Sequence, residues 1–235
     1  MIKSFLILIS ISTLLFASEQ IILVVGDDMN ASVAKLECYE GSKLVYKDIN
    51  VNIGKNGLGV GLGVVPLRES ATMPLKKEGD KKAPMGVFRL SALFGYAQNK
   101  NYKMPYLHIS EKLICVDDSN SKDYNTIIMA KGNEKSFEYM QRKDNQYKIG
   151  IVVQHNARAI AKRGSCIFIH IQKGKKKPTV GCTSMKEKTL VKIVKWLDKS
   201  KNPILIQIPK SLSPQIKTLY PSIKNSKLLQ NGALL

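Results

Sequence analysis

The sequence predicts a mostly β domain with a few helices, an α+β fold dominated by strands. Short apolar or alternating runs follow one another along much of the chain, and glycine and small polar residues separate them. Only one segment has the clear period of an amphipathic helix. The 235 residues are enough for one domain with a sizeable core.

A secretory signal peptide is predicted at residues 1–18. One lysine near the start precedes an apolar and hydroxyl stretch from Ser4 to Phe16, and the small residues Ala17 and Ser18 follow it. This stretch is short against the ~20 residues that a spanning helix needs, which favours cleavage over an uncleaved anchor. No later segment is long and apolar enough to span a bilayer. The mature protein is therefore expected in the periplasm or cell envelope, with no stable membrane span.

The predicted strands begin directly after this segment, with "QIILVVGD" at 20–27, "SVAKLECYE" at 32–40 and "KLVYKDINVNIG" at 43–54. The glycine-rich stretch 54–65 lacks the Lys-Ser/Thr ending of a phosphate loop and indicates a turn between strands. Pro84 and Gly86 mark a turn before the strand "VFRLSALF", and the polar "DDSNSKDYN" at 117–125 is expected to be a loop.

Two further predicted strands in the middle region contain candidate functional residues. "QYKIGIVVQHNA" places His155 near a strand exit, and "SCIFIHI" has the period of two that puts Cys166, Phe168 and His170 on one face. Both are rich in β-branched and aromatic residues, which supports their assignment as strands.

The one predicted helix follows Cys182. Ser184 and Glu187 form a capping-box pattern ahead of "KTLVKIVKWLDKS", in which Leu190, Val194 and Leu197 supply an apolar stripe. "NPILIQIP" then returns as a strand. Residues 210–235 are basic and rich in hydroxyls and are expected to be a loosely attached tail, which places the domain at 19–209.

The composition is strongly basic, with a formal net charge of +19 and dense lysine groups in "LKKEGDKK" and "KGKKKP". Such a surface suits an anionic partner, for example an acidic cell-wall polymer, although a role in solubility alone stays open. Nucleic acid is disfavoured because the signal peptide exports the chain and no helix carries base-reading residues. Histidine and cysteine do not cluster as a metal site requires, so no metal and no cofactor is expected.

Cys182 is the leading candidate for a nucleophile. It stands between Gly181 and Thr183 at the predicted helix start, where unpaired amides and the helix dipole favour the thiolate. The amides of Gly181 and Thr183 could also stabilise an oxyanion, and His170 could accept the thiol proton. The alternative is a non-catalytic envelope protein with Cys182 in a disulfide to Cys166 or another cysteine, with Cys38 and Cys115 structural in either case.

These residues resemble the L,D-transpeptidase catalytic domain, often called the YkuD domain. The family's signature is a histidine, a spacer and then Ser/Thr-His-Gly-Cys, and here His170 is followed by Thr179-Val180-Gly181-Cys182. "APMGVF" resembles the family's Thr-Pro-x-Gly-x-Phe, and the likeness covers roughly residues 50–208. It implies a β-sandwich or barrel with a helix after the catalytic cysteine.

The resemblance also implies an activity on peptidoglycan stem peptides. Cys182 would attack the peptide bond after the third stem residue and release D-Ala, with His170 as general base. Transfer of the resulting thioester to an amine would give a 3–3 cross-link, whereas transfer to water would make the enzyme an L,D-carboxypeptidase. A cysteine amidase or peptidase acting on other envelope peptides is a third hypothesis.

Three features depart from the family pattern. Val180 replaces the histidine before the glycine, the spacer after His170 is short, and Ser184 replaces an arginine often found two residues after the cysteine. The missing contact to a substrate carboxylate must then come from elsewhere. The substrate-binding candidates are His155, Arg89, Arg163, Thr179 and Ser184.

Overall fold

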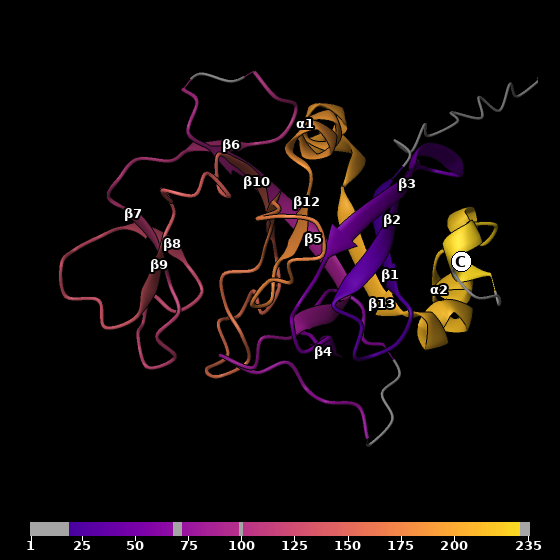
Figure 1. Cartoon of the computed structure of the whole chain (residues 1–235), viewed down its shortest axis with the longest axis horizontal. Helices are drawn as coiled ribbons and strands as arrows, with labels where there is room; N and C mark the ends of the chain where they lie inside the picture. The colour runs from indigo at the N-terminus through magenta and orange to yellow at the C-terminus, as the bar shows by residue number, and fades with distance from the viewer. Residues whose placement is uncertain (1–18, 68–71, 99–100, 231–235) are drawn as a thin grey trace, which may run out of the picture.

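The computed structural model describes residues 19–67, 72–98 and 101–230, so the predicted signal peptide lies outside it. Eight strands follow one another in the order β10, β11, β12, β3, β2, β1, β13 and β5, and β5 pairs back with β10 (Figure 1). The sheet is therefore closed like a barrel, and the predicted mostly-β fold is confirmed. The strands are β1 (Gln20–Gly26), β2 (Val33–Glu40), β3 (Lys43–Asn52), β5 (Ala83–Gly95), β10 (Ile149–Val153), β11 (Phe168–Ile171), β12 (Thr183–Met185) and β13 (Ile204–Pro209), while β4 (Leu58–Val60) and β6 (Tyr106–His108) add to β5.

The barrel core explains the unbroken apolar run of β1. Every residue of β1 is buried, and the strand pairs in parallel with β13, Ile21 opposite Ile204. A strand covered on both faces reads as a continuous apolar run instead of an alternation. On β11 only one face is inward, so Ile169 lies in the core while Phe168 and His170 face outward.

The predicted helix exists as α1 (Glu187–Trp196), which packs against β10 and β11 through Leu190, Ile193 and Val194. The predicted capping box is wrong. Lys186 precedes the helix without a side-chain cap, and Ser184 belongs to β12, where it is in register with His170 on β11 and Asn52 on β3. The pairing on both sides holds Ser184 in extended backbone, so the helix cannot begin there.

The segment after Pro209 is not a loosely attached tail up to residue 230. It forms α2 (Ser213–Leu219) and the 3₁₀ turns η2 (Lys210–Leu212), η3 (Pro221–Ile223) and η4 (Lys227–Leu229). A further 3₁₀ turn, η1 (Lys199–Lys201), lies earlier in the chain, between α1 and β13. Five apolar side chains of this segment are buried in the main core: Leu212, Ile216, Ile223, Leu228 and Leu229. The Ser226 hydroxyl also donates to the Glu37 carboxylate at 2.6 Å. Apolar burial and this hydrogen bond hold the segment on the barrel.

A second, smaller sheet stands beside the barrel (Figure 1). It consists of β7 (Leu113–Val116), β8 (Ile127–Met129) and β9 (Phe137–Tyr139), with β7 in the middle. The polar stretch 117–125 is a loop as predicted, and the strands on either side of it were not predicted. In the described part of the chain, no helix is long and apolar enough to cross a membrane.

Candidate active site

Cys182 lies on the outer face of the barrel, one residue before β12. The backbone N–H of Phe168 donates to Cys182 Sγ at 3.3 Å, and the thiol reaches the carbonyl oxygen of Cys166 at 3.5 Å. The loop before it is fixed by Thr179, whose hydroxyl donates to the carbonyl of Cys182 at 2.6 Å. Gly181 sits at φ +152°, in the region that favours glycine. These contacts hold the sulfur against β11.

His170 shares that face with Cys182. His170 is in register with Ser184 on the neighbouring strand, and Cys182 is two residues before Ser184. Registered neighbours project to the same side of a sheet, and residues two apart along an extended chain share that side. The sequence therefore brings the two predicted catalytic residues together on one surface.

The environment of His170 determines its tautomer. Nδ1 lies 2.8 Å from the carbonyl oxygen of Ile171, which can only accept a hydrogen bond, so Nδ1 carries the proton. Nε2 is then the basic nitrogen of the ring. Burial lowers the pKa of His170 to about 4, so the imidazole is neutral at ordinary pH and able to accept a proton.

Two residues of the site carry no motif and were not predicted. The Tyr147 ring packs edge-on against His170, with 5.2 Å between ring centroids, and its hydroxyl donates to Glu138 on β9 at 2.7 Å. Tyr147 belongs to the same apolar cluster as Cys182 and Phe168. Burial raises the pKa of Tyr147 and of Glu138. Nothing in "SFEYM" or "DNQYKIG" signals this pairing, because it arises only when the small sheet packs on the barrel.

The predicted activation of Cys182 by a helix start is wrong. The residue precedes a strand, and α1 begins only at Glu187. Its side chain is 5% exposed beneath the small sheet, and burial, with the negative charge of Glu138 added, raises the pKa of Cys182 to about 12. In this closed arrangement the sulfur is a thiol, so ionisation depends on transfer of its proton to a base.

The oxyanion assignments also change. The N–H of Gly181 already donates to the Thr179 hydroxyl at 3.1 Å, so it does not face an incoming carbonyl. Thr183 is part of the β12 ladder opposite Ile169, and its hydroxyl donates to Gln207 inside the barrel at 2.7 Å. Thr179 is thus a residue that positions the cysteine loop.

Three of the remaining substrate-binding candidates lie in different parts of the molecule. The His155 ring is buried with both nitrogens engaged, Nδ1 by the N–H of Leu62 at 3.2 Å and Nε2 by the carbonyl of Arg163 at 2.8 Å. Its predicted substrate contact is wrong, because the ring holds two loops together. Arg89 is exposed on β5, three strands from β12 around the barrel. Arg163 donates through Nε to the carbonyl of Lys76 at 3.3 Å.

Ser184 is the substrate-binding candidate that lies beside His170 in the sheet. It is 1% exposed, it adjoins His170 in the sheet, and its hydroxyl has no hydrogen-bond partner. A buried polar group without a partner is rare in folded proteins and calls for an explanation.

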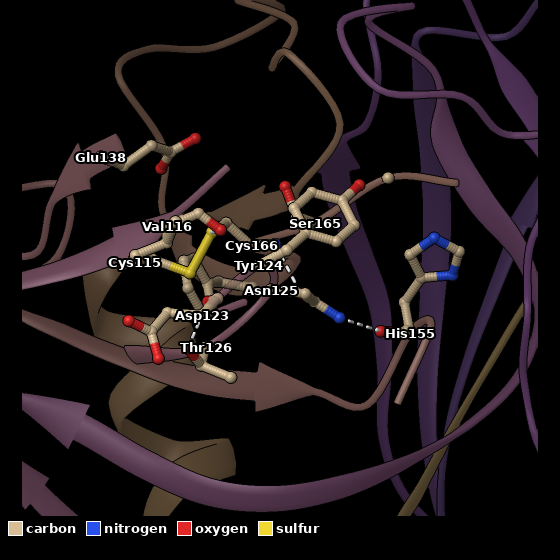
Figure 2. Close-up of a disulfide and its surroundings, with 12 residues drawn as sticks. Cys115, Val116, Asp123, Tyr124, Asn125, Thr126, Glu138, His155, Ser165 and Cys166 are labelled. Carbon is tan, nitrogen blue, oxygen red and sulfur yellow. Dashed lines mark hydrogen bonds between the residues drawn. A yellow bond between two sulfur atoms is a disulfide. The ribbon is translucent and has the colours of Figure 1, made fainter. Parts of the chain in front are cut away.

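The disulfide in the structure does not include Cys182, in contrast to the alternative hypothesis that Cys182 is bonded to Cys166 or another cysteine. Cys115 on β7 is bonded to Cys166 (Figure 2). Cys182 and Cys38 are free and buried. Cys166 has a left-handed backbone, φ +53°, ahead of β11, so it leaves the predicted strand alternation and turns toward the small sheet. Asn125 beside the disulfide donates to the His155 carbonyl at 2.9 Å and accepts from the N–H of Cys166 at 3.0 Å. The small sheet is thereby attached to the loop that holds Cys182.

A cavity of about 370 Å³ lies along the seam between the small sheet and the barrel. Its lining includes Cys166 and Phe168, the two residues whose backbone contacts the Cys182 sulfur, together with Ile127 and Val152. Within the described ranges, no group of three or more His, Cys, Asp or Glu side chains could hold a metal ion.

Comparison with known proteins identifies the domain. A family model for the L,D-transpeptidase catalytic domain, YkuD, matches residues 21–206. No curated protein and no solved structure matches the chain. The matched span includes the barrel from β1 into β13 and both Cys182 and His170.

Proposed function

Because the chain belongs to the L,D-transpeptidase catalytic-domain family, we propose that it is an exported cysteine enzyme that cross-links peptidoglycan stem peptides. The observation that carries the proposal is that His170 on β11 and Cys182, directly before the neighbouring strand β12, share the outer face of the sheet. The bond from His170 Nδ1 to the Ile171 carbonyl supports the role of general base, since it leaves Nε2 to accept a proton.

The chemistry follows from these two groups. Nε2 of His170 takes the thiol proton as Cys182 Sγ forms a bond to the carbonyl carbon of the third stem residue. The C–N bond to D-Ala then breaks, and the imidazolium returns the proton to the leaving amine. A side-chain amine of a second stem attacks the thioester, forms the 3–3 amide and releases the thiol. Water in place of that amine would give a free carboxylate, the L,D-carboxypeptidase reaction.

The cover over the site implies a motion before catalysis. Cys182 and His170 are each 5% exposed, and Tyr147 lies over the imidazole. The seam cavity leads to the residues that hold the sulfur. We expect the small sheet to move away from β11 along this seam, so that a stem peptide reaches the thiol.

The test uses the purified mature protein, disaccharide tetrapeptides and mass spectrometry of the products. Release of D-Ala together with a 3–3 dimer is the expected result, and free tripeptide without dimer would identify the carboxypeptidase reaction. Both products should fall by at least about a thousandfold in Cys182→Ala and in His170→Ala. His108→Gln is the matched control, because His108 is exposed on β6. Full activity in Cys182→Ala would refute the proposal.

A further inference from the structure

A basic cavity of about 320 Å³ lies where β2 and β3 meet the loop that follows β11. Its lining includes four lysines and three amide side chains: Lys35, Lys175, Lys176, Lys186, Asn50, Asn52 and Gln172. Asn52 is in register with Ser184, which is in register with His170. Two strand spacings of about 4.7–4.9 Å place the backbone of Asn52, on the cavity wall, about 10 Å from the backbone of His170.

The loop that presents two of these lysines is held in place. Asn52 Nδ2 donates to the carbonyl of Gly174 at 3.0 Å, and the N–H of Gln172 donates to the carbonyl of Met185 at 2.8 Å. At the other end, the N–H of Thr179 donates to the carbonyl of Ile53 at 2.9 Å. The dense lysine group of "KGKKKP" is therefore fixed over β3 and beside the cysteine loop.

These four lysines have no internal counter-charge within bonding distance. No ion pair within 4 Å joins any of them to a carboxylate in the residues that the structure covers. One carboxylate, that of Asp27, also lines the cavity. It lies close enough to Lys210 to offset part of the lowering of the Lys210 pKa by burial. Gathering like charges without partners is unfavourable unless an anion offsets them.

We propose that this cavity binds carboxylate groups of the stem peptide that Cys182 attacks. The inference rests on the proposed function for the identity of the ligand. An extended chain spans about 3.3–3.6 Å per residue, so a stem-peptide carboxylate about 10 Å from the scissile bond reaches the lysines.

The experiment measures binding without turnover. Full mature Cys182→Ala protein is titrated calorimetrically with a peptidoglycan tetrapeptide, with the same tetrapeptide amidated at its carboxylates, and with inorganic polyphosphate. The second protein carries Lys35→Gln, Lys175→Gln, Lys176→Gln and Lys186→Gln. The matched control removes four exposed lysines that do not line this cavity: Lys112, Lys122, Lys195 and Lys224.

We expect the tetrapeptide to bind about tenfold more weakly to the cavity variant, with the control variant unchanged. Amidation of the ligand should cause a similar loss in the parent and little further loss in the cavity variant. Equal binding by the two lysine variants would overturn the inference, and so would polyphosphate binding in the cavity without tetrapeptide binding. If the parent protein, which retains Cys182, turns over the tetrapeptide but binding does not depend on the lysine charges, only the inference about the cavity is refuted. Charge-dependent binding without turnover would refute the proposed function alone.

Discussion

Two buried histidines stand out among the single residues because each is kept neutral by its surroundings. Burial lowers the pKa of His155 and of His170 to about 4. The first ring joins two loops through both nitrogens, and the second keeps one nitrogen basic beside a thiol. The same physical effect thus serves stability in one case and, by our proposal, chemistry in the other.

These histidines predict how stability depends on pH. Their pKa values lie below those of the unfolded chain, near 6.5, so the unfolded state binds more protons between about pH 6.5 and 4. The free energy of unfolding should therefore have its full value above pH 6.5. As the pH drops toward 4, it should fall by up to about 3 kcal/mol for each histidine. Urea titrations at several pH values measure this.

The matched variants for that titration are His170→Gln and His108→Gln. The first should remove about one proton from the slope of unfolding free energy against pH. The second replaces an exposed histidine and serves as the control for the substitution itself. A slope that is the same in His170→Gln as in the parent would contradict the assignment.

Among the elements, the strands were easier to predict than the contacts between them. β1, β2 and β13 follow from apolar runs and alternation, which are local properties of the chain. The helix after Cys182 was predicted from its apolar stripe, but its start was misplaced because Ser184 and Glu187 match a capping box. Two strand pairings hold Ser184 extended, and a local pattern cannot reveal them.

The small sheet could not be predicted for a related reason. β7, β8 and β9 have three or four residues each and are separated by polar loops. Four cysteines allow three pairings when two disulfides form, and sequence alone does not choose the bond from Cys115 to Cys166. Tyr147 and Glu138 enter the site only through that packing. Cys182 and His170 could be proposed as a pair from the sequence because each lies on or directly beside one of two neighbouring strands. The residues that cover them could not be predicted.

The disulfide predicts how tightly the small sheet covers Cys182. It closes a loop with a sequence separation of 51 residues, and its removal should lower the free energy of unfolding by up to about 4 kcal/mol. In Cys115→Ser/Cys166→Ser we expect iodoacetamide to modify Cys182 faster than in the parent, at least about tenfold. Mass spectrometry of peptides measures both rates.

Cys38 provides an internal control for that labelling. Its thiol is fully buried in the barrel core, away from the small sheet. Faster labelling of Cys182 with unchanged labelling of Cys38 would report local opening of the cover. If labelling became faster by the same factor at both cysteines, it would report global unfolding. That result would contradict the idea that the small sheet opens locally over Cys182.

At the scale of the whole molecule, the barrel closes through contacts between distant parts of the chain. β5 pairs back with β10, and β1 near the N-terminus pairs with β13 near residue 204. The C-terminal segment then covers β2, where Ser226 and Tyr39 both donate to the Glu37 carboxylate. Its basic, hydroxyl-rich sequence suggested a tail because the buried residues are spaced irregularly among 3₁₀ turns and carry no regular period.

That covering role predicts a large effect of a single substitution close to the C-terminus. Leu229 is fully buried in the main core, whereas Leu219 at the end of α2 is 41% exposed. Leu229→Ala should lower the free energy of unfolding by about 2–5 kcal/mol, because it removes buried methyl groups and leaves a cavity. Leu219→Ala, the matched control, should change it by about 0.5 kcal/mol or less. Chemical denaturation followed by Trp196 fluorescence measures both values. If Leu229→Ala were as mild as the control, residues 210–230 would be a detachable segment and the barrel would be stable without them.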